Sequence, residues 1–178
     1  MTTNETTVLV AYASKMGGTK EIAVEIAAEL AAAGLNVRTQ DAAEVRSLDG
    51  YDAAVVGSAI YTSRWRPAAI ALLKQLAERN EELRPMPTWL FQSGPCGENA
   101  DAPVPTPKKV EKYVSRIGAA PPVTFGGRLE AATATGFIAR KMAAGPMAGD
   151  FRDFDRVRQF ADSIAERLNA PKSDALWR

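Results

Sequence analysis

Short apolar runs alternate along the chain with longer segments in which apolar residues recur every three or four positions. The first run, residues 7–13, reads TVLVAYA, which is typical of a strand buried on both faces. The next segment, 19–33, places Ile22, Ile26 and Leu30 four residues apart and predicts an amphipathic helix. Repeated strand–helix alternation requires parallel strands joined by helical crossovers, so the chain is restricted to the α/β class, with helices on both faces of the sheet.

The same pattern assigns the remaining elements. The expected strands are 7–13, 36–41, 53–58, 88–93 and 122–126. The expected helices are 19–33, 67–79, 108–117 and 153–168, with a weaker helical segment at 131–144. The 178 residues fit a single domain with a core of about 7–168 and loose ends.

Composition excludes several classes of function. The sequence has no histidine, which rules out Ser-His-Asp triads and His-ligated zinc, and its one cysteine rules out an intramolecular disulfide. A net charge of +1 argues against a nucleic-acid binder that relies on bulk charge. The polar residues 1–7 and the absence of an apolar run of ~18 residues indicate neither a signal peptide nor a membrane span, so we expect a cytoplasmic protein.

A glycine-containing loop lies between the first strand and the first helix. It consists of Ser14, Lys15, Met16, Gly17, Gly18 and Thr19. Two glycines allow successive N–H groups to point inward, the helix N-terminus adds a positive dipole end, and two residues supply hydroxyl groups, which together suit a phosphate. The loop matches neither GxGxxG nor GxxxxGK[ST], so a dinucleotide or a P-loop nucleotide is disfavoured. The alternative is a tight turn with a helix cap.

The pattern Ser14-x-x-Gly17-x-Thr19 resembles the FMN phosphate loop of the flavodoxin family, with Met16 where many members have threonine. Residues 56–61 (VGSAIY) followed by Arg64-Trp65 resemble the second flavin loop of the menaquinone-dependent protoporphyrinogen IX dehydrogenase branch. Residues 125–129 (FGGRL) and 149–154 (GDFRDF) resemble the late motifs of that branch. The resemblance implies a three-layer flavodoxin-like fold, a five-stranded parallel sheet of order 2-1-3-4-5, and FMN as cofactor.

An isoalloxazine ring needs aromatic or aliphatic surfaces on its faces and backbone polar groups at its rim. The loops after the third and fourth strands are expected to supply them. The expected contacts are Ser58, Ala59, Ile60, Tyr61, Trp65, Ser93, Gly94, Pro95, Cys96 and Gly97. Trp65 can instead plug the start of the next helix, and a lone cysteine such as Cys96 is more often inert than catalytic. No general acid or base is assigned.

Two functions remain open. One is an FMN oxidoreductase that oxidises a small-molecule substrate and passes electrons to a quinone, with protoporphyrinogen IX as the substrate that the resemblance implies. The other is a flavodoxin-type carrier between redox proteins, a class that is typically strongly acidic, whereas the pI here is about 7.8. Segment 103–148 holds seven basic and two acidic residues. This positive charge suits an anionic substrate or peripheral contact with the inner face of a membrane. The alternative is that the charges simply lie on solvated helix faces.

A long connection, residues 127–150, separates the last strand from the last helix. Its apolar residues Phe137 and Ile138 lie beside the cations Arg140 and Lys141. We expect this segment to form a substrate-facing or membrane-facing surface. The alternative is that its apolar residues fold back on the edge of the sheet.

Overall fold

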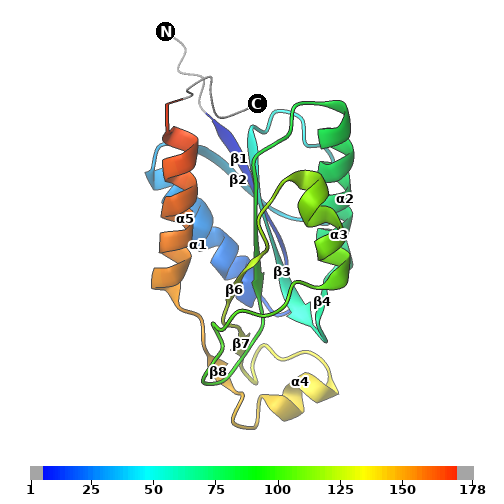
Figure 1. The fold of residues 1–178 in the computed structure, drawn as a ribbon. Coiled ribbons are helices and arrows are strands. Elements are labelled where there is room, and N and C mark those ends of the chain that lie inside the picture. The colour runs from blue at the N-terminus through cyan, green and yellow to red at the C-terminus, as the bar shows by residue number, and fades with distance from the viewer. Residues whose placement is uncertain (1–5, 172–178) are drawn as a thin grey trace.

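Five parallel strands form the central sheet of the computed structural model, which describes residues 6–171. Residues 1–5 and 172–178, at the ends expected to be loose, lie outside the described part of the chain. The strands are β1 (Thr7–Ala13), β2 (Asn36–Asp41), β3 (Ala53–Tyr61), β5 (Thr88–Ser93) and β6 (Val123–Phe125). Their order is β2-β1-β3-β5-β6, which confirms the predicted order 2-1-3-4-5 (Figure 1).

Helices cover both faces of this sheet, as the sequence predicted (Figure 1). They are α1 (Gly18–Ala32) and α5 (Phe154–Asn169) on one face, and α2 (Pro67–Glu82) and α3 (Lys108–Ile117) on the other. Strand β1 is apolar on both faces because both are buried. Val8 and Val10 pack in the core with α1 and α5, and Leu9 and Ala11 pack in the core with α2 and α3.

Strand β3 is longer than expected. It continues past Ser58 to Tyr61 and turns back as the short antiparallel strand β4 (Arg64–Trp65). The turn residues Thr62 and Ser63 have φ angles of 46° and 58°, a left-handed conformation that non-glycine residues rarely adopt. Such two-residue turns usually carry Asn-Gly or Asp-Gly, so this hairpin could not be recognised from the residues of its turn.

The connecting segment, residues 127–150, lies beyond the carboxyl ends of the sheet strands (Figure 1). It contains a two-stranded antiparallel ribbon of β7 (Arg128–Leu129) and β8 (Gly149–Asp150), with the short helix α4 (Phe137–Met142) between them. The helix expected at 131–144 is therefore shorter, since the threonines and the glycine that precede Phe137 are poor helix formers. No helix within residues 6–171 has the length and apolar character needed to cross a membrane.

Candidate functional site

The first loop, residues 14–19, joins β1 to α1 at the carboxyl edge of the sheet. Gly17 has a φ of 85° and donates its N–H to Ser14 Oγ at 3.0 Å. This turn leaves the backbone N–H groups of Gly18 and Thr19 without an acceptor among residues 6–171. Unpaired N–H groups at a helix N-terminus carry partial positive charge, so the loop has the geometry of an anion site.

The second loop, residues 58–65, comprises the end of β3, the turn at Thr62 and Ser63, and β4, and it lies beside the first loop. Buried Ser58 fixes its base, because Ser58 Oγ donates to the carbonyl of Ala59 at 2.9 Å and accepts the N–H of Arg66 at 3.0 Å. Tyr61 is partly exposed, and Lys15 Nζ of the first loop lies 5.5 Å from the centre of its ring. Burial raises the pKa of the Tyr61 phenol, so it stays protonated at neutral pH.

Trp65 is 5% exposed and packs in the core formed with α2 and α3. Its indole N–H donates to Gln92 Oε1 at 3.0 Å, and Gln92 Nε2 donates to Thr124 Oγ1 and to the carbonyl of Val104. Every polar group of the Gln92 side chain is thus satisfied inside the protein. The side chain of Trp65, at the end of the second loop, is buried in this core, where it joins β4 to β5.

The third loop, residues 93–97, is wedged between the second loop and β7. Ser93 Oγ donates to the carbonyl of Gly126 at 3.1 Å, and the carbonyl of Pro95 accepts the N–H of Gly127 at 2.6 Å. A Cβ on Gly94 would lie 2.9 Å from the carbonyl oxygen of Ile60, and a Cβ on Gly127 would lie 2.8 Å from the backbone of Gly94. The absence of side chains at these glycines lets the backbones approach one another this closely.

Cys96 is partly buried at the far side of the third loop. It packs with Met16 of the first loop against a small apolar cluster of Leu129, Ala134 and Ala143 from the connecting segment. Burial raises the pKa of the Cys96 thiol, and the nearby Asp150 carboxylate raises it further. The thiol is therefore protonated at neutral pH, which is the opposite of an activated nucleophile.

Two arginines that the sequence analysis gave no function lie against the first loop. Arg128 Nη1 is 2.8 Å and Arg152 Nη1 is 2.7 Å from the carboxylate of Glu21, in the first turn of α1. Arg152 also binds Asp150 through two nitrogens and donates to the carbonyl of Gly18. Burial alone would raise the pKa of Glu21, but the hydrogen bonds and charges of the two arginines outweigh it and lower the pKa.

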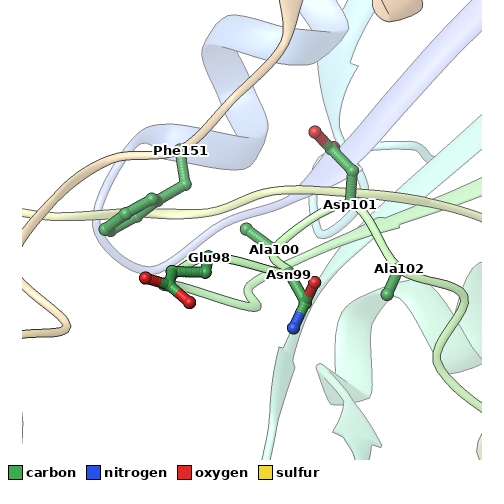
Figure 2. A pocket seen from close by; sticks show the side chains of 7 residues that line it. Glu98, Asn99, Ala100, Asp101, Ala102 and Phe151 are labelled. Carbon is green, nitrogen blue, oxygen red and sulfur yellow. The ribbon is translucent and has the colours of Figure 1, made fainter.

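A hollow of about 450 Å³ borders the third loop on its outer side. It is lined by residues 97–102 and by Phe151, and Figure 2 shows the Phe151 ring near the Glu98 carboxylate. Asp101 at this hollow is already engaged, because its Oδ1 accepts the N–H of Gly126 at 2.8 Å and pairs with Arg156. Gly97, at the end of the third loop, also lines this hollow. The other residues that line it belong to none of the three loops.

Comparisons with known proteins give the following relationships. Residues 9–149 match the family described as a flavodoxin domain. No curated protein matches the sequence.

The fold is similar to that of several solved structures. A flavodoxin from the domain Archaea has a TM-score of 0.63 at 15% identity, covering 91% of this chain and 98% of its own. A Streptococcus pneumoniae flavodoxin has a TM-score of 0.61 at 20% identity, covering 90% and 99%. The rubredoxin oxygen:oxidoreductase of Desulfovibrio gigas has a TM-score of 0.58 at 17% identity over 92% of this chain, which spans only 36% of that protein.

Proposed function

The chain belongs to the flavodoxin domain family, and from this premise we propose that it is an FMN-dependent oxidoreductase with its cofactor at the three loops beyond the sheet. FMN is the cofactor that membership of this family implies. The observation that carries the proposal is the convergence of the first, second and third loops at the carboxyl edge, where ligands bind in open α/β sheets. Bound FMN would supply one- and two-electron chemistry.

The residues present fit this cofactor. The left-handed Gly17 and the unpaired N–H groups of the first loop suit a phosphate, with the Arg128 side chain as the neighbour of both glycines. We assign residues 14–19 to the phosphate, and residues 58–61 and 93–97 to the rim and faces of the ring. Trp65 we assign to positioning, because its indole N–H is held by Gln92 inside the core.

The finer proposal is a dehydrogenase of protoporphyrinogen IX or a related reduced substrate that delivers electrons to a quinone. The late motifs at 125–129 and 149–154 and the basic segment 103–148 support it. An electron carrier between redox proteins is the alternative, and family membership supports that function equally. Turnover of a reduced small molecule by the purified protein separates the two: an enzyme oxidises it without a second protein, and a carrier does not.

The purified protein is expected to be yellow with one FMN per chain. In that protein, Tyr61→Ala should weaken FMN binding or shift the reduction potential of the flavin. The reason is that Tyr61 lies at the end of β3, next to the turn of the second loop, with Lys15 over its ring. Loss of an aromatic stacking surface should lower the affinity about 2- to 12-fold, since such contacts contribute about 0.5–1.5 kcal/mol. Titration of the apoprotein with FMN and a spectroelectrochemical potential measure both effects.

Tyr61→Phe is the matched control, because it keeps the ring and removes only the hydroxyl. It should retain most of the FMN affinity. If Tyr61→Ala matches the parent protein in absorbance, affinity and potential, Tyr61 does not contact the flavin.

We further propose that helix α4 makes the peripheral membrane contact. Its residues Phe137 and Ile138 are 83% and 74% exposed, beside the cations Arg140 and Lys141. The double substitution Phe137→Ser with Ile138→Ser should lower binding to vesicles of anionic phospholipid by about tenfold or more, because each buried methylene contributes about 0.8 kcal/mol. Sedimentation with vesicles measures this.

The control for that substitution is Leu83→Ser, which removes a similarly exposed apolar side chain at the C-terminus of α2. Leu83→Ser should leave vesicle binding unchanged, and neither variant should lose thermal stability. Equal vesicle binding by the α4 variant and the parent protein would rule out this contact.

A further inference from the structure

The side chain of Arg128 lies against the first loop although 112 positions separate it from Met16. It is 14% exposed. A Cβ built on Gly17 would be 3.4 Å from Arg128 Nη2, and a Cβ built on Gly18 would be 3.7 Å from Arg128 Cβ. The guanidinium therefore reaches the same backbone turn whose N–H groups form the anion cradle.

The hydrogen bonds of this guanidinium are incomplete on one edge. Nη1 is engaged by Glu21, whereas Nη2 makes only a long contact of 3.4 Å with the carbonyl of Met16. Among the side chains of residues 6–171, Arg128 Nε is the one buried nitrogen or oxygen without a hydrogen-bond partner. A buried donor left unpaired costs free energy, so such a group calls for an explanation.

Other arginines of the same structure show what this edge of a guanidinium binds. The Nε and Nη2 hydrogens point the same way and form a fork that fits two oxygens of one anion. In Arg152 this fork holds the two oxygens of Asp150 at 2.8 and 2.6 Å, and in Arg116 it holds Glu81 Oε1. In Arg128 no carboxylate of residues 6–171 pairs with the equivalent fork.

We propose that Nε and Nη2 of Arg128 bind the phosphate of FMN, an assignment that rests on the proposed function. The phosphate site then consists of the first loop and one arginine supplied by β7. Backbone N–H groups and hydroxyls provide the shape of the cradle, and Arg128 provides its full positive charge. This charge offsets the hydroxyl group that is missing at Met16.

Glu21 is the positioning partner of Arg128 in this arrangement. It binds Nη1, and among residues 6–171 it leaves Nε without a partner and Nη2 with only the long contact to the Met16 carbonyl. Because Arg152 shares the Glu21 carboxylate and is itself held by Asp150, the β7–β8 ribbon and α1 fix the guanidinium from both sides. Recognition of the phosphate, rather than of the flavin ring, is therefore the property that depends on Arg128.

The test compares FMN with riboflavin, which has the same ring and no phosphate. Arg128→Gln should weaken FMN binding about 10- to 100-fold, the effect of losing a charge-assisted hydrogen bond, and leave riboflavin affinity within about twofold of the parent. Quenching of flavin fluorescence on titration of the apoprotein measures both affinities. The ³¹P NMR signal of bound FMN should also shift between the parent and the variant.

Arg116→Gln is the matched control, because Arg116 pairs with Glu81 on the surface of α3 and α2 and should affect neither affinity. A parent protein that binds neither flavin would contradict the proposed function itself. If the parent binds FMN and Arg128→Gln lowers neither affinity, or lowers both equally, the assignment of Arg128 is wrong and the proposed function stands.

Arg128→Lys decides the question if Arg128→Gln does not fold. Lysine keeps the charge beside Glu21 but lacks the fork. FMN affinity should then fall about fivefold or more with riboflavin affinity unchanged. Equal affinities for FMN in Arg128→Lys and the parent protein would overturn the proposal.

Discussion

Replacing Gly17 by valine is expected to raise the dissociation constant of FMN about 100-fold or more. Gly17 has a φ of 85°, a region that costs an ordinary residue about 1–2 kcal/mol and a β-branched residue more. A Cβ at this position would also lie 3.4 Å from Arg128 Nη2, with the two valine methyl groups beyond it. The turn that presents the unpaired N–H groups cannot form with this side chain, so the phosphate loses its cradle. FMN titration of the apoprotein measures the effect.

Gly18→Ala serves as the control for Gly17→Val. Gly18 begins α1 and has no positive φ, and its added Cβ would make ordinary contacts of 3.7 and 3.8 Å with Arg128. The sequence does not distinguish the two glycines, whereas the structure shows that only Gly17 has a positive φ. FMN affinity in Gly18→Ala should stay within about threefold of the parent, because alanine is a good helix former. FMN binding by Gly17→Val as tight as that of the parent would show that this loop does not hold the phosphate.

The second large effect is on stability. Gly57→Ala should lower the free energy of unfolding by about 3 kcal/mol, the upper part of the usual range for an overpacked core. Gly57 pairs with Phe91 across β3 and β5, and an added Cβ would lie 2.0–2.3 Å from three carbons of the Phe91 ring. That ring cannot move aside easily, since it packs against Phe125 and Phe160. Thermal denaturation should show a drop of about 6–12 °C.

Two further variants test the cause of that loss. Gly145→Ala adds the same methyl group where the nearest atom is 3.5 Å away, and it should change the melting temperature little. In the Gly57→Ala background, Phe91→Leu should cost less stability than it does in the parent, because it relieves the clash. Additive effects of the two substitutions would contradict the proposed contact between Gly57 and Phe91.

The sheet was predictable from sequence because its strands and helices have strong and different periodicities. The run at 7–13 is apolar on both faces, and the structure buries it between two helical layers. The β3–β4 hairpin was missed because its turn uses Thr62 and Ser63 in place of glycine. The β7–β8 ribbon was missed because strands of two residues have no periodicity to detect.

The candidate site could be read from the sequence only where its residues are neighbours in the chain. The first loop is recognisable as a candidate phosphate cradle because two glycines stand directly before a helix. Arg128 and Arg152 were visible as parts of two motifs, but nothing in the sequence connects either of them to Glu21. Their meeting depends on the path of the chain from β6 to α5, which lies across the carboxyl edge of the sheet. Exposed Lys15 and partly exposed Tyr61 likewise meet only because two loops share that edge.

The long separation between Glu21 and its two arginines also orders events during synthesis. The first loop leaves the ribosome early, and β1, α1 and β3 can pair before the second half of the chain is made. The guanidinium groups that complete the surroundings of this loop arrive 107 and 131 positions later. If Arg128 binds the phosphate as proposed, a nascent chain can have formed β1, α1 and β3 and still lack the charge that retains a phosphorylated ligand. On this proposal, tight retention of the flavin depends on the later part of the polypeptide, and a chain that ends before residue 128 is expected to hold FMN less tightly.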